Sequence, residues 1–124
     1  QEIVDSGLVE LGSHTLTHPS LKSLSHEKAQ KEITESKADL EKMFKEKVVS
    51  FAYPGGSYND DTEHLVRDAG YTIALTTKPG ITISEDGLYE VHRIRPGYLT
   101  LAFIKNYFQT LLFKRENNSL KIHI

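Results

Sequence analysis

The chain alternates between short apolar runs and amphipathic helical patterns, and this order constrains its fold more than any other feature. The apolar runs lie at residues 8–12, 48–53 and 71–77, and each has the length of a strand. A helical pattern at 25–47 separates the first two runs, and a shorter one that begins at Asp60 separates the second from the third. Strand, helix, strand, helix, strand is typical of a parallel sheet. The sequence therefore predicts an α/β fold.

Length and composition exclude several other classes of protein. The 124 residues amount to one domain or to part of one. A net charge of -2 argues against a nucleic-acid-binding protein, which would normally show a basic patch. No apolar run approaches the roughly 18 residues of a membrane span. The chain has no cysteine, and so it forms no disulfide and no thiolate metal site.

Capping signals lie at the ends of the helical patterns. Ser25 can act as the N-cap of the first helix. Asp60 and Glu63 have the spacing of a capping box at the start of the second helix, and Gly70 can close it. After residue 77 the pattern changes, and the sequence predicts four further elements. These are short strands at 81–83 and 88–95, a helix at 100–113 and a terminal strand at 120–124.

Two histidines follow the first predicted strand. His14 and His18 lie four residues apart and Pro19 comes directly after them. Imidazole is the commonest side-chain ligand for zinc-like metals, and two such ligands can bind one ion if a third comes from elsewhere. The alternative is a pair of loop histidines that bond backbone carbonyls, because the H-x-x-x-H spacing recurs by chance. Thr15 stands where the glutamate of an H-E-x-x-H metalloprotease motif would be.

The second predicted strand ends in Tyr53, Pro54, Gly55 and Gly56. Proline fixes one φ angle and glycine relieves steric limits, so these residues indicate a strand-to-helix turn. A second interpretation is a backbone whose free N–H groups stabilise an oxyanion. The ends of parallel strands lie on one rim, where functional residues of such folds gather. We therefore expect the three strand ends to converge.

Together these motifs resemble a known family. Residues 10–19 (ELGSHTLTHP) resemble the second motif of the polysaccharide deacetylases, the NodB-homology domain of carbohydrate esterase family 4. Residues 51–59 (FAYPGGSYN) resemble the third motif. The resemblance covers most of residues 1–113. It implies part of a distorted (β/α) barrel with fewer than the usual eight strands.

The resemblance also implies an activity. Members of the family remove N-acetyl, and sometimes O-acetyl, groups from chitin-like, peptidoglycan or poly-N-acetylglucosamine chains. A divalent metal, commonly zinc, is held by an aspartate and two histidines, and a second aspartate is the general base. By motif match the two histidines are His14 and His18. The resemblance further suggests an extracellular or cell-surface protein.

The third motif carries the remaining site residues that the resemblance implies. The backbone N–H that helps to hold the oxyanion matches a position near Gly55. Tyr53, Pro54 and Tyr58 would contact the sugar. The late catalytic histidine of the family has no clear match, and His92 on an alternating strand is more simply explained as a structural residue.

One departure from the family pattern shapes our expectations. Both aspartates belong to a first motif that precedes the histidines, and this chain contains nothing like it. We expect residues 1–124 to be a single partial domain that lacks the N-terminal strands, with its core motifs within 8–113. The chain alone would then be poorly active, and its exposed strand edge would favour self-association. The alternative is an inactive carbohydrate-binding or structural remnant of the fold.

Overall fold

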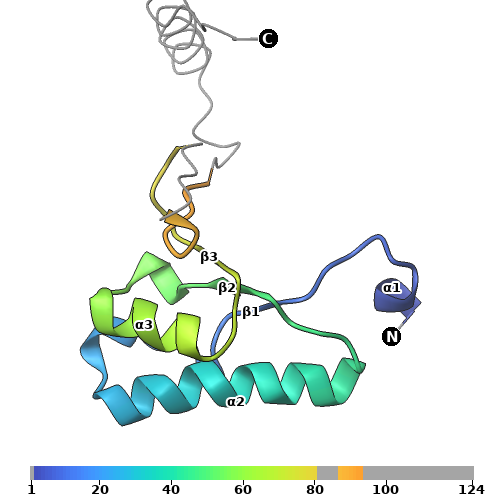
Figure 1. The fold of residues 1–124 in the computed structure, drawn as a ribbon, viewed down its shortest axis with the longest axis horizontal. Helices are drawn as coiled ribbons and strands as arrows, with labels where there is room; N and C mark the ends of the chain where they lie inside the picture. Colours follow the sequence, from blue (N-terminus) through green and yellow to red (C-terminus); the bar gives the residue numbers. More distant parts are fainter. Residues whose placement is uncertain (1, 81–86, 94–124) are drawn as a thin grey trace, which may run out of the picture. The chain divides into compact units, whose positions relative to one another are not determined.

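The computed structural model describes residues 2–80 and 87–93. The elements run in the order α1 (Glu2–Asp5), β1 (Gly12–Ser13), η1 (Leu21–Ser23), α2 (His26–Phe44), β2 (Ser50–Ala52), η2 (Pro54–Gly56), α3 (Asp60–Asp68) and β3 (Ile73–Leu75) (Figure 1). The predicted strands at 81–83 and 120–124 and the predicted helix at 100–113 lie outside these residues.

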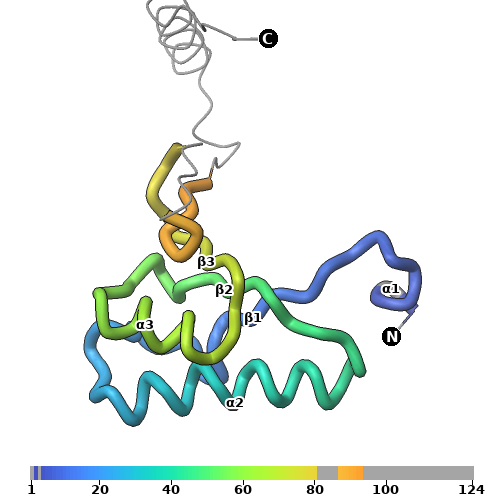
Figure 2. The backbone as a smooth tube through the Cα atoms, in the orientation of Figure 1, coloured from blue at the N-terminus to red at the C-terminus, as the bar shows by residue number. Residues whose placement is uncertain are grey.

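The three strands form a parallel sheet in the order β1-β2-β3, as the alternating pattern predicts. Gly12 pairs with Ser50 in β1 and β2, and Phe51 pairs with Ala74 in β2 and β3. The chain moves across the sheet in one direction, and right-handed crossovers then place both helices on the same face. The path of each crossover can be followed in the backbone tube (Figure 2).

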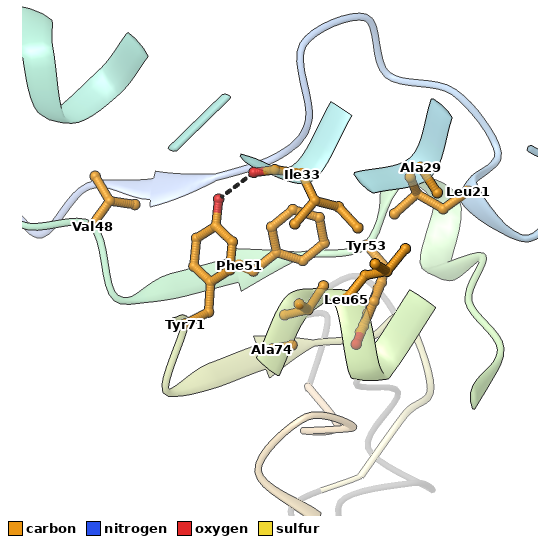
Figure 3. Packing of buried hydrophobic residues seen from close by; sticks show 10 residues of the cluster. Leu21, Ala29, Ile33, Val48, Phe51, Tyr53, Leu65, Tyr71 and Ala74 are labelled. Carbon is orange, nitrogen blue, oxygen red and sulfur yellow. Dashed lines mark hydrogen bonds between the residues drawn. The ribbon is translucent and has the colours of Figure 1, made fainter. Parts of the chain in front are cut away.

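Within the described residues, a hydrophobic core fills the space between this face and the two helices (Figure 3). Its members are Leu21, Ala29, Ile33, Val48, Phe51, Tyr53, Leu65, Val66, Tyr71 and Ala74. The Phe51 ring lies 5.3 Å from the Tyr53 ring and 5.1 Å from the Tyr71 ring, between centroids. The Tyr71 hydroxyl donates a hydrogen bond of 3.0 Å to the Ile33 carbonyl, so the one polar atom of that buried ring is satisfied.

The first strand is shorter than predicted and starts later. Residues 8–11 form no strand, and the Leu8 side chain is 88% exposed. Pairing with β2 begins only at Gly12. An apolar run forms a strand only where a neighbouring strand pairs with its backbone N–H and C=O groups. Residues 8–11 have no such partner among the described residues.

The helix caps also differ in detail from the sequence prediction. Asn59, rather than Asp60, is the N-cap of α3, and its side chain accepts a hydrogen bond of 2.9 Å from the Thr62 N–H. The Thr62 hydroxyl accepts the Asn59 N–H in return, which completes a capping box one residue earlier than predicted. Ser25 does stand at the N-cap of α2, but its side chain makes no cap hydrogen bond.

The predicted strand at 88–95 is wrong where the structure describes it. Residues 87–90 form a turn, and only Val91 makes a bridge, parallel to Leu75 of β3. The Val91 N–H donates to Ala74 and the Thr76 N–H donates to Val91, both at 2.9 Å. The Ala74 N–H also donates to the Leu88 carbonyl at 2.8 Å, and the Arg93 N–H donates to the Lys78 carbonyl at 3.1 Å. The segment therefore follows β3 through separate backbone hydrogen bonds without forming a regular strand.

No helix within residues 2–80 and 87–93 is long and apolar enough to cross a membrane. In the described part of the chain, β1 pairs with β2 alone. Its edge offers two residues for pairing instead of the five expected, and a short edge strand is a weak template for a second chain. Self-association stays a prediction.

We expect Ile33→Ala to lower the free energy of unfolding by about 2–5 kcal/mol, because it empties a fully enclosed site between α2 and the sheet. Met43→Ala on the same helix is the matched control, since this side chain is 67% exposed. It should change the free energy by no more than about 0.5 kcal/mol. Urea unfolding followed by circular dichroism measures both, and equal losses would contradict the assigned core.

Candidate functional site

His14 is the first residue after β1, and a hydrogen bond to the neighbouring strand orients its ring. Its Nδ1 lies 2.6 Å from the carbonyl oxygen of Ala52, the last residue of β2. A carbonyl oxygen only accepts, so Nδ1 carries the hydrogen. The lone pair of the neutral ring is then on Nε2, which is the arrangement that second-shell carbonyls impose on metal-binding histidines.

His18 lies beside His14 in spite of the turn between them. The two ring centroids are 4.8 Å apart, with an angle of 72° between the planes. The turn contains two residues with left-handed backbone, Thr15 at φ 67° and His18 at φ 59°. The Thr15 hydroxyl donates to the His14 carbonyl and accepts the His18 N–H at 3.1 Å. Residues 14–18 are called the histidine turn below.

Glu32 of α2 contacts this turn, and the sequence analysis assigned it no role. Its Oε2 accepts the backbone N–H groups of Leu16 and Thr17, each at 2.9 Å. Its Oε1 accepts the Thr17 hydroxyl at 2.6 Å. Partial burial acts to raise the pKa of Glu32, but these three hydrogen bonds together outweigh it, and the pKa lies below its usual range. No sequence spacing connects the pair, because 15 residues separate Glu32 from Thr17.

Gly55 presents backbone at the end of β2. It has a left-handed φ of 61° and is exposed, and a Cβ built on it would meet nothing within 4 Å. Its N–H has no hydrogen-bond acceptor among the residues described. Gly56 differs, because a Cβ there would lie 2.1 Å from Oγ1 of Thr77. Gly55 therefore leaves a backbone N–H free, and Gly56 allows the chain after β2 to lie close to Thr77 after β3.

The two tyrosines of the third motif lie in different surroundings. Tyr53 is 1% exposed and its ring belongs to the core, where burial raises the pKa of its hydroxyl. Pro54 is buried as well. Tyr58 is half-buried and stacks on Tyr53 at 4.8 Å, and the Lys78 ammonium donates to its hydroxyl. Tyr53 and Pro54 therefore support the turn from inside, and their contact with a sugar stays a prediction.

The three strand ends do converge, as expected from a parallel sheet. The hydrogen bond between His14 and Ala52 joins the first end to the second. The Thr77 hydroxyl, 3.5 Å from the Gly55 carbonyl, and the contact between Lys78 and Tyr58 join the second to the third. Within residues 2–80 and 87–93, no three histidine, cysteine, aspartate or glutamate side chains come together as a metal site. The described site therefore supplies two imidazoles.

Comparison with known proteins supports the resemblance. The family model for polysaccharide deacetylases matches residues 1–74, more than half of the chain. The chain belongs to the polysaccharide deacetylase family. The matched segment contains α1 to α3 and all three strands up to Ala74, and so it includes the histidine turn and Gly55.

Individual members of the family agree with this assignment. The Bacillus subtilis protein YxkH, named for the same family, is 34% identical over 97 residues, which are 77% of this chain and 35% of that protein. A peptidoglycan-N-acetylglucosamine deacetylase of Bacillus cereus is 36% identical over 66 residues, 53% of this chain and 30% of that protein. The chain thus spans about a third of the length of these relatives.

A solved structure confirms the predicted fold class. A polysaccharide deacetylase from Bacillus cereus matches with a TM-score of 0.72 and 32% identity. The match covers 85% of this chain and 34% of that protein. The parallel strands and two helices described above are therefore part of a NodB-like α/β fold.

Alanine at the two glycines should have unequal effects. Gly55→Ala should lower the free energy of unfolding by about 1–2 kcal/mol, because a residue with a Cβ is unfavourable in the left-handed conformation and no other atom is displaced. Gly56→Ala carries the same cost and also displaces Thr77, which adds about 1–3 kcal/mol. Thermal unfolding of the two variants provides the comparison, and a larger loss for Gly55→Ala would show that the turn is wrongly described.

Proposed function

We propose that the protein containing this chain removes acetyl groups from a polysaccharide built on N-acetylglucosamine, with a divalent metal, most simply zinc, held in part by His14 and His18. Family membership supports an acetyl-removing activity. A relative that is 36% identical over 66 residues is named for peptidoglycan N-acetylglucosamine, and this supports the class of substrate. Such polymers lie outside the membrane, and we therefore propose an extracellular or cell-surface location.

The orientation of His14 is the observation that carries the proposal. Its Nδ1–H is held by Ala52, so Nε2 is free to bind a metal. His18 supplies a second imidazole with its ring 4.8 Å away, centre to centre. Imidazole nitrogen suits zinc and related ions. The third protein ligand of such a site would come from outside the residues described.

The bound metal would polarise the acetyl carbonyl and lower the pKa of water. The remaining steps concern the chain's own groups. The exposed N–H of Gly55 can donate a hydrogen bond to the oxygen that gains charge as water attacks. Because Gly55 has no side chain, substrate can approach that N–H closely. Among the aromatic residues of the third motif, Tyr58 is only half-buried, whereas Phe51 and Tyr53 are buried. We propose that a sugar ring packs against Tyr58.

Zinc binding tests the proposal directly. We expect titration calorimetry to detect zinc binding to the intact protein, and His14→Ala or His18→Ala to weaken it by more than about 100-fold, since even outer-shell changes cost about 10–100-fold. His64→Ala is the matched control, because His64 is an exposed histidine on α3. Equal effects of all three substitutions would refute a site at the histidine turn.

Activity is measured on N-acetylglucosamine oligomers, by acetate release from the intact protein. His14→Ala and His18→Ala should abolish the release and His64→Ala should leave it unchanged. The other function that stays open is a carbohydrate-binding remnant, which the lack of a three-residue metal site within the described residues favours. Oligomer binding without acetate release in the intact protein, unaffected by zinc, would support that alternative.

A further inference from the structure

We propose that Glu32 is a positioning residue, which holds the histidine turn in the conformation that brings His14 and His18 together. This inference concerns the same site and rests on the proposed function for its role in the reaction. It starts from the three hydrogen bonds that one carboxylate receives from Leu16 and Thr17. Both residues lie between the histidines, and neither is a candidate ligand.

The histidine turn needs such support because its backbone is strained. Thr15 and His18 both have left-handed φ angles without being glycine. A side chain at Cβ makes this conformation unfavourable, so it persists only where neighbouring contacts hold it. Between the two strained residues, successive N–H groups of Leu16 and Thr17 point at the same oxygen of Glu32. Successive N–H groups of this kind form an anion-binding nest, and here the anion belongs to the protein itself.

The helix that carries Glu32 is itself firmly placed. Ile33, its neighbour, is completely enclosed in the core. Ser36, one helical turn further along, lies 2.7 Å from the Ser13 hydroxyl in a buried contact. Helix α2 therefore contacts the chain next to both histidines. Ser36 contacts Ser13, which directly precedes His14, and Glu32 contacts Thr17, which directly precedes His18. The position of the turn thus follows from the packing of α2.

Carboxylate chemistry explains why this position carries glutamate. An ionised carboxylate is an acceptor only, and its two oxygens can receive all three donors. Glutamine has the same shape, but its amide nitrogen cannot accept the Thr17 hydroxyl. Alanine removes every acceptor. Glu32→Gln therefore removes part of the hydrogen bonding to the turn, and Glu32→Ala removes all three hydrogen bonds. Both substitutions leave the buried side chain of Ile33 in place.

The first test needs no metal. Amide hydrogen exchange by NMR in the metal-free chain should be at least about ten times faster at Leu16 and Thr17 in Glu32→Ala, with a smaller change in Glu32→Gln. The imidazole signals of His18 should shift as well. Glu35→Ala is the matched control on the exposed side of α2 and should leave all these signals unchanged. Unchanged exchange and unchanged His18 signals in Glu32→Ala would overturn the proposal.

The second test separates positioning from a merely structural role. Zinc affinity, measured well below the unfolding temperature, should fall about 10–100-fold in Glu32→Ala, and Glu32→Gln should recover part of it. Fast exchange with unchanged zinc affinity would show that Glu32 supports the turn without positioning the ligands. If the intact protein binds no zinc, the proposed function fails, and the His18 signals of the metal-free variants still decide whether Glu32 holds the turn.

Discussion

The register between β1 and β2 decides where the histidines lie. Ser13 pairs with Phe51 in the last pair between β1 and β2, so His14 comes out of β1 beside Ala52, the last residue of β2. The Ala52 carbonyl, left beyond the last pair of the register, then accepts the His14 ring N–H. A shift of one residue would reverse the faces of the strand and place His14 in the core. The tautomer of the candidate ligand therefore depends on strand pairing.

Helix α2 has two tasks on different parts of its surface. Its apolar stripe, centred on Ile33, encloses the core. Glu32 and Ser36, which are four residues apart and thus neighbours on one side of the helix, contact the histidine turn and the end of β1. Two left-handed residues in that turn cost of order 1–3 kcal/mol each. The hydrogen bonds from this helix and within the turn offset that strain, so core stability and site geometry are linked.

Much of the fold could be predicted because its signals are local. Each of the three apolar runs contains a strand of the parallel sheet, and each of the two helical patterns contains a helix. Gly70, with a left-handed φ, follows the end of α3 as predicted. The two strand predictions that failed share one physical origin. Residues 8–11 and 88–90 have strand-like sequences but no continuous partner among the described residues, and pairing is a non-local property. Asn59 displaced Asp60 as N-cap because its side chain could reach the Thr62 N–H.

For the site, the sequence by itself determined which residues are the candidates for the chemistry. His14, His18 and Gly55 are recognisable from their spacing and from the glycine-rich turn after the second strand. Only the tertiary structure decided that Ala52 orients His14, that Glu32 contacts the turn, and that the Tyr53 ring belongs to the core. These three facts join positions 15 to 38 residues apart or depend on burial. Such contacts arise from helix packing and strand register, which leave no local pattern in the chain.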